Sequence, residues 1–223
     1  EGGPLMFRVL LYSQWKWSRL VVTLGTIAAF ALPIVSVQGF ARDAANPVRS
    51  GEMLSAMQSW GVLYPVLAAA LGLLVAMATW APDHRGRHVH ALSLPLPRWR
   101  YALLRFEAGL VLLSPPVLAL FLGALLATRA APIPAGLEGY PIALVIRFAL
   151  ATAVAFSVFF AISAGTTRMA AIILATLGAV IVIQVLAGAA GVQINLLTPL
   201  QSAFLNWPGP LAIFTGRWML IDV

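Results

Sequence analysis

Residues 83–105 read DHRGRHVHALSLPLPRWRYALLR. This stretch is the longest polar interruption between the apolar segments, and it carries five of the fourteen Lys and Arg residues and all three histidines. A proline inside a helix removes a hydrogen bond and clashes with the preceding turn, so Pro95 and Pro97 predict that one short helix ends near Ser93 and another begins near Pro97. We therefore expect a short helix with a docking surface outside the membrane. The simpler alternative is a basic loop that only follows the positive-inside rule.

The composition of the chain is that of a membrane protein. Of its 223 residues, 61% are hydrophobic and 9% are charged, whereas a soluble domain carries roughly 25% charged residues. This composition predicts an all-α integral membrane protein. The net charge of +7 is explained by cations beside apolar segments, so we expect no nucleic-acid partner. The chain has no cysteine, which excludes disulfides and thiolate metal sites.

About 20 apolar residues are needed to cross the hydrocarbon core of a bilayer. By this measure the sequence predicts five transmembrane helices, at residues 20–40, 60–81, 101–127, 141–163 and 169–190. Residues 83–100 form the loop between the second and third spans. Residues 6–18 are amphipathic and rich in aromatic side chains, which predicts an interfacial helix, although a frayed start of the first span is the alternative. Residues 191–223 have a mixed composition and predict an extracellular or re-entrant segment, or the start of a sixth span.

The distribution of cations predicts the orientation of the chain. With the N-terminus in the cytoplasm, nine Lys and Arg residues lie on the cytoplasmic side and five lie outside. Because cytoplasmic loops carry an excess of cations, we expect a multi-pass protein of the cell membrane, of the bacterial inner-membrane type, with a cytoplasmic N-terminus. The loop at residues 83–100 is then cytoplasmic.

Several reaction classes are excluded by residues that the sequence lacks. Lys16 is the only lysine, and it is not part of a phosphate-binding loop, so the chain is not itself a P-loop ATPase. No histidine lies in a predicted span, which excludes a membrane b-type cytochrome. No acidic residue lies deep in a span, which argues against a proton- or sodium-coupled transporter. We therefore expect no enzyme activity and no cofactor in this chain.

Four polar residues are candidates for a binding role. His84 and His88 are four residues apart, as two metal ligands on a helix are, but no HExxH glutamate accompanies them, and solvated histidines are the favoured interpretation. Arg147 lies about 9 Å into the fourth predicted span, where it either extends to the surface or binds an anionic group of a substrate. Gln184 lies in the fifth predicted span and either lines a substrate pathway or bridges helices, and bridging is favoured.

The loop also resembles a known family. Its residues follow the order in which permeases of the type 2 ABC exporter family place an acidic residue, a glycine, a leucine, a proline, a basic residue and a last cation before the third span. In this chain these are Asp83, Gly86, Leu92, Pro95, Arg98 and Arg105. The chain differs from the family in having Arg87 where a small hydroxyl residue often follows the glycine, and in having Pro97.

The resemblance implies a permease subunit with six spans, a cytoplasmic coupling helix between the second and third spans, and a second copy or a homologous partner. A separate ATPase subunit would bind ATP and Mg²⁺ and dock on the coupling helix. The residues expected to couple to that ATPase are Gly86, Val89, Leu92, Leu94, Pro95 and Arg98, and those expected in the substrate pathway are Arg147 and Gln184. The alternative is a non-transporting membrane subunit that anchors or assembles a larger complex.

Overall fold

The computed structural model describes residues 3–42, 50–85, 97–134, 136–164, 172, 175–176, 178–180, 182–183, 209 and 211–222. The chain divides into two compact units, of which the first comprises Glu1–Phe160 with Arg217–Val223 and the second comprises Ala161–Gly216. All of the long helices begin in the first unit. A short 3-10 helix, η1 (Ala212–Phe214), belongs to the second unit.

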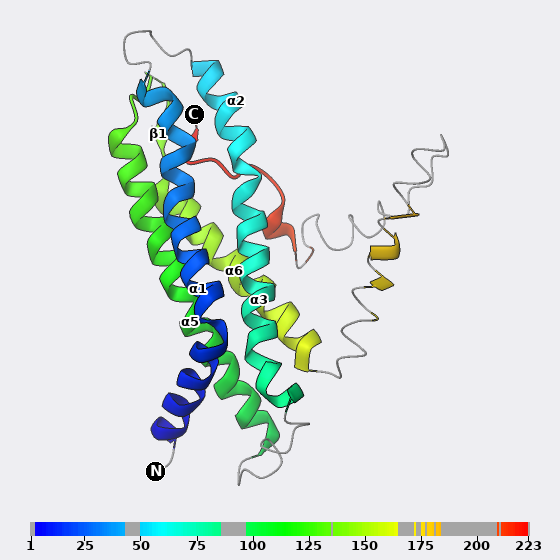
Figure 1. Cartoon of the computed structure of the whole chain (residues 1–223). Helices are drawn as coiled ribbons and strands as arrows, with labels where there is room; N and C mark the ends of the chain where they lie inside the picture. Colours follow the sequence, from blue (N-terminus) through cyan, green and yellow to red (C-terminus); the bar gives the residue numbers. More distant parts are fainter. Residues whose placement is uncertain are drawn as a thin grey trace. The chain divides into compact units, whose positions relative to one another are not determined.

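Five helices and one pair of short strands make up the described part of the first unit (Figure 1). They are α1 (Gly3–Arg42), α2 (Ser50–Gly61), α3 (Leu63–Arg85), α5 (Arg98–Ala130), α6 (Pro141–Ala164), β1 (Glu138–Gly139) and β2 (Ile221–Asp222). Helices α1 and α5 begin at the same end of the unit and lie side by side, and α3 runs in the opposite direction beside them. The strands pair antiparallel, with Glu138 opposite Asp222.

In the part of the chain that the structure describes, four helical segments are long and apolar enough to cross a membrane: Met6–Gln38, Gly51–Asp83, Arg98–Ala130 and Pro141–Ala164. They agree with the first four predicted spans and with the predicted class, a mostly helical, multi-pass membrane protein. The fifth predicted span, residues 169–190, falls largely outside the described residues and stays a prediction. The predicted coupling helix also lies in a segment that the structure does not describe.

Helix α1 runs without a break from Gly3 to Arg42, so it contains both the predicted interfacial helix at 6–18 and the first predicted span at 20–40. No glycine or proline separates the two predicted elements. The Ser18 hydroxyl, which could have capped a new helix, instead donates back to the Gln14 carbonyl at 2.8 Å. The interfacial orientation of residues 6–18 stays a prediction.

The helices flanking the predicted loop are longer than expected. Helix α3 continues to Arg85, four residues beyond the predicted end of the second span. At its other end, a one-residue break at Val62 separates α3 from α2. Helix α5 begins at Arg98, which confirms the predicted helix start near Pro97. The Pro97 carbonyl accepts hydrogen bonds from the backbone N–H groups of Arg100 and Tyr101. The expected loop 83–100 is therefore shorter at both ends.

Small residues allow the helices of the first unit to pack closely. A Cβ added at Gly123 of α5 would lie 2.3 Å from the Phe30 carbonyl oxygen of α1, and one added at Gly72 of α3 would lie 2.6 Å from the Phe156 backbone nitrogen of α6. The residues of α1 that are buried near its start form a single stripe: Leu10, Gln14, Ser18 and Val22. Two members of this stripe, Gln14 and Ser18, are polar.

The segment at residues 217–222 returns to the first unit. Its Trp218, Leu220 and Ile221 side chains are buried, and the Tyr140 N–H group donates to the Leu220 carbonyl at 2.8 Å. Residues 217–222 therefore pack onto the first unit. The described residues from 211 to 222 contain the 3-10 helix η1 and the strand β2, and the sixth span stays a prediction.

Candidate functional site

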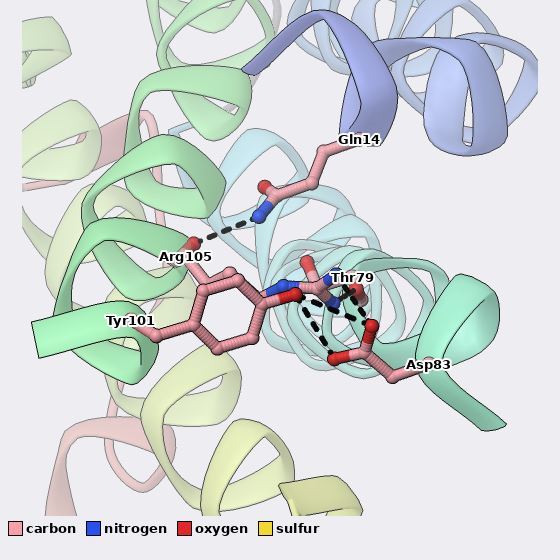
Figure 2. A network of polar contacts seen from close by, with 5 residues as sticks. All are labelled: Gln14, Thr79, Asp83, Tyr101 and Arg105. Atoms are coloured by element: carbon pink, nitrogen blue, oxygen red, sulfur yellow. Dashed lines mark hydrogen bonds and ion pairs between the residues drawn. The ribbon is translucent and has the colours of Figure 1, made fainter. Parts of the chain in front are cut away.

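Five polar residues from three helices meet near the start of α5 (Figure 2). We call them the Arg105 cluster. They are Gln14 of α1, Thr79 and Asp83 of α3, and Tyr101 and Arg105 of α5. All five residues are buried. A buried polar group is tolerated only where it is hydrogen-bonded, and a buried charge only where it is paired, so the contacts within this cluster decide whether the three helices can pack together.

Arg105 is at the centre of the cluster. Its Nη2 atom donates to Asp83 Oδ1 at 3.0 Å, and its Nη1 atom donates to the backbone carbonyl of Thr79. The Tyr101 hydroxyl lies 3.2 Å from each carboxylate oxygen of Asp83 and donates to that carboxylate. The carboxylate therefore accepts hydrogen bonds from two side chains of α5.

Two aromatic rings flank the Arg105 guanidinium. Its Cζ atom lies 4.8 Å from the centroid of the Tyr101 ring and 5.3 Å from that of the Trp80 ring. Such cation–π contacts stabilise a desolvated cation by about 2 kcal/mol. The Trp80 ring in turn contacts Phe160, with ring centroids 5.1 Å apart, and Phe160 contacts Phe106 and Phe156. The Arg105 guanidinium therefore contacts the Asp83 carboxylate and also lies against an aromatic cluster formed by α3, α5 and α6.

The Arg105 cation binds at a helix end that stabilises it, whereas the Asp83 carboxylate lies in the last turn of its own helix, α3, and is held by side chains of α5. A helix carries partial positive charge at its N-terminus and partial negative charge at its C-terminus. Arg105, from α5, binds a carbonyl near the C-terminal end of α3, whereas Asp83, from α3, binds Tyr101 in the first turns of α5. The ion pair thus links two helix ends that lie at either side of the segment 86–96.

Gln14 extends the cluster to α1. Its Nε2 atom donates to the Arg105 backbone carbonyl at 3.1 Å. Among the described residues, Gln14 Oε1 and Arg105 Nε make no hydrogen bond although both are buried. The Gln14 contact is made to the backbone of α5, so this hydrogen bond does not depend on the side chain at position 105.

Burial makes the ion pair sensitive to the loss of either member. The side chains of Arg105 and Asp83 are 4% and 3% exposed. Removing both charges of such a pair is often nearly neutral for stability, whereas removing one costs about 3–5 kcal/mol because the other is left buried and unpaired. We conclude that the pair fixes the arrangement of α3 and α5 more than it adds to their stability.

Most of the residues predicted to couple to an ATPase lie outside the described part of the chain. These are Gly86, Val89, Leu92, Leu94 and Pro95, and Gln184 of the predicted pathway is also outside it. Arg98 is described and is exposed at the start of α5. Whether these residues couple to an ATPase stays a prediction.

Sequence analysis placed Asp83 in the loop 83–100 and Arg105 near the start of the third predicted span, and both residues belong to helices. Asp83 lies in the last turn of α3 and Arg105 in the second turn of α5. Arg105 had been counted among the cytoplasmic cations, but it is buried and its charge is paired within the protein. The physical reason is that Asp83 and Arg105, which end one span and begin the next, are brought together when α3 and α5 pack.

Arg147 is far from this cluster, at the end of the unit where the strands pair. Its Nη1 atom donates to the Arg217 carbonyl, and its Cζ atom lies 4.7 Å from the centroid of the Trp218 ring. Arg147 therefore binds the returning segment 217–222. Its predicted role in binding an anionic substrate stays a prediction.

Sequence reasoning missed Gln14, Thr79 and Tyr101. The signal for Gln14 was present, because it lies four residues from both Leu10 and Ser18 and so continues an apolar stripe with a polar side chain. Thr79 takes part through its backbone carbonyl, which no side-chain pattern reveals. Within the described residues, no three His, Cys, Asp or Glu side chains are grouped so that they could hold a metal ion.

Comparisons of the chain with family models, with curated proteins and with solved structures found no match.

Proposed function

We propose that this chain is the permease subunit of an ATP-driven exporter, in which a separate ATPase subunit docks on the segment 86–96. Two observations support the proposal. The first is the resemblance of the loop to the type 2 ABC exporter family, on the residues named above. The second, which carries the mechanism, is that the Arg105 cluster links the two helix ends that flank this segment to each other and to α1.

The cluster gives a physical route from the loop to the helices. If the ends of a loop were held by exposed, flexible contacts, a displacement of the loop would be absorbed by those contacts. Here α3 and α5 are joined by a buried ion pair, and α1 is joined to α5 by Gln14. A partner that moves segment 86–96 therefore moves three helices together, as a coupling helix requires.

The orientation and the partners are part of the proposal. With nine cations on one side and five on the other, the end of the unit that carries the Arg105 cluster is cytoplasmic, in the inner membrane of a bacterial cell. The ATPase subunit supplies the ATP and Mg²⁺ chemistry. A second permease copy, or a homologous permease, completes the pathway, and the surrounding lipids are the remaining partners.

Co-purification with an ATPase tests the docking role. We expect the full chain, purified from its native membrane, to carry a subunit that hydrolyses ATP in the presence of Mg²⁺. Leu92→Asp places a charge on the predicted docking ridge, and we expect it to abolish the co-purified hydrolysis. Two control variants should retain the ATPase. Val9→Asp adds the same charge at an exposed position at the same end of the first unit, and Arg147→Ala alters the opposite end of the unit.

Two outcomes count against the proposal. If Leu92→Asp retains the ATPase in full, the segment 86–96 is not the docking site. If the wild-type chain carries no ATPase, the alternative function is favoured, that of a membrane subunit that anchors or assembles a larger complex.

The orientation has its own test, which the absence of native cysteine makes simple. An impermeant thiol reagent added to intact cells should label a Ser50→Cys variant and leave a Ser93→Cys variant unlabelled. Labelling of Ser93→Cys in intact cells would place the segment 86–96 outside the cell, where no ATPase can reach it.

A further inference from the structure

The first turns of α1 carry an exposed stripe of two basic and two aromatic side chains. Arg8, Tyr12, Trp15 and Arg19 follow one another at spacings of four, three and four residues, so they lie on one side of the helix. All four are exposed, and Tyr12 is 71% exposed. This stripe lies on a different side of α1 from the buried residues Leu10 and Gln14, so packing of α1 against α5 leaves it uncovered within the first unit.

The start of α5 presents the same chemistry at the same end of the unit. Arg98, Trp99 and Arg100 are exposed, and Trp99 is 69% exposed. The hydrogen bond from Gln14 to the Arg105 carbonyl places the first turns of α1 and α5 at this end, and Figure 1 shows both helices beginning there. We call these seven residues, together with Lys16, the basic-aromatic face.

The exposed charges at this end of the unit are mostly positive. Among the described residues at this end of the unit, the exposed charged side chains are five cations and one carboxylate, that of Glu107. The only other described carboxylate there, Asp83, is buried and paired. The exposed cations are therefore complementary to a negatively charged surface.

We propose that the basic-aromatic face binds the headgroups of anionic phospholipids. Tyr and Trp rings favour the boundary between hydrocarbon and water, and basic side chains beside a membrane attract anionic lipids. Both helices continue into segments long and apolar enough to cross a bilayer. The aromatic rings favour a lipid surface over an acidic soluble protein, which would not require three indole and phenol rings beside the cations. This proposal rests on membrane insertion, and it shares Arg98 with the residues expected to couple to the ATPase.

The cations lie at two levels along the helix axes, and both can reach headgroups. Gln14 and Arg105 are level with each other because they are hydrogen-bonded. From that level, Arg98 lies about 10 Å toward the helix starts and Arg19 lies about 8 Å in the other direction. The deeper cations have long, flexible side chains that can extend to the headgroups from within the bilayer.

Lipid retention tests the proposal. The full chain is reconstituted in vesicles of equal parts phosphatidylglycerol and phosphatidylcholine, extracted in a mild nonionic detergent and purified, and its bound lipids are counted by mass spectrometry. We expect phosphatidylglycerol to be enriched about five-fold over phosphatidylcholine, the factor expected from about one basic residue's interaction with an anionic surface. Combined replacement of Arg8, Arg19, Arg98 and Arg100 by Gln should return the ratio to one.

Matched variants separate charge from fold. Replacing the same four arginines by Lys keeps the charge and should keep the enrichment, and Arg129→Gln removes an exposed cation at the other end of α5 and should also keep it. Should the Gln variant fail to fold, the wild-type chain still decides, because 1 M salt shortens the screening length to about 3 Å and should abolish the enrichment. Equal retention of the two lipids by the wild type, enrichment that 1 M salt leaves intact, or full enrichment in a folded Gln variant would each overturn the proposal.

Discussion

Two arginines anchor opposite ends of the first unit, and they do so by different means. Arg105 is buried, with its charge paired to Asp83 and its guanidinium beside two aromatic rings. Arg147 is half-buried, binds the Arg217 carbonyl and lies over the Trp218 ring. The first arginine joins long helices to one another, whereas the second holds a short returning segment. The difference indicates that the Arg105 end has one tightly defined arrangement and that the Arg147 end can loosen locally.

The strongest test of this difference is removal of the Arg105 charge. Arg105→Met leaves the Asp83 carboxylate buried without its cation, which should lower the free energy of unfolding by about 3–5 kcal/mol. Chemical unfolding in detergent measures this change. The matched control is the double variant Asp83→Leu with Arg105→Met, which removes both charges and should be clearly more stable than the single variant. Equal instability of the two would mean that the stranded charge is not the cause.

Gly61, which lies close to the returning segment 217–222, tests how closely that segment must pack against α2. A Cβ added at Gly61 would lie 2.4 Å from the Trp218 backbone carbonyl oxygen, whereas one added at Gly51, on the same helix, meets nothing within 4 Å. Gly61→Ala should therefore destabilise the protein by about 1–3 kcal/mol. Gly51→Ala should be neutral or slightly stabilising, because alanine favours a helix. Identical unfolding curves for the two variants would contradict the close approach.

Replacement of Arg147 should have a smaller and more local effect than replacement of Arg105. Arg147→Met removes a hydrogen bond from a charged group and a cation–π contact, which together contribute about 2 kcal/mol. The expected result is opening of the segment 217–222 without unfolding of the helices. A Leu220→Cys reporter, buried in the wild type, should react with a thiol reagent at least several-fold faster in the Arg147→Met background. An unchanged rate would show that Arg147 does not hold this segment.

The smallest effect is expected at Gln14. Gln14→Leu removes one hydrogen bond to the Arg105 carbonyl, which contributes about 1 kcal/mol, and it also removes a buried amide oxygen that makes no hydrogen bond among the described residues. We expect a loss of about 1 kcal/mol or less in the free energy of unfolding, measured as for Arg105→Met. A loss as large as that of Arg105→Met would mean that α1 depends on this contact far more than one hydrogen bond allows.

The sequence predicted the long helices well because their signal is local. An apolar run of membrane length is visible at residues 141–163 without knowledge of any other segment, and α6 extends only one residue beyond it. The start of α5 was also predictable, because Pro97 has no backbone N–H group and suits a helix start. The continuity of α1 was not predictable, since the residues around Ser18 are compatible with either a helix or a helix start.

The site was harder to predict because its contacts join distant residues. The orientation was predicted by counting the cations on each side of the membrane, and every arginine contributes equally to that count. The count therefore could not show that Arg105 is buried whereas Arg98 is exposed. Its burial depends on Asp83, which is 22 residues away and becomes a neighbour only when α3 and α5 pack. Strand β2 was missed because two residues are too few to show an alternating pattern.

The close approach of α1 and α5 at Gly123 has a mechanical consequence. Gln14 and Phe30 of α1 are about 24 Å apart along the helix, and the residues they meet on α5, Arg105 and Gly123, are about 27 Å apart. The two parallel helices thus touch at two points separated by nearly equal lengths. Two contacts this far apart oppose both rolling and pivoting of α1 against α5, so a force applied to one of these helices is carried to the other.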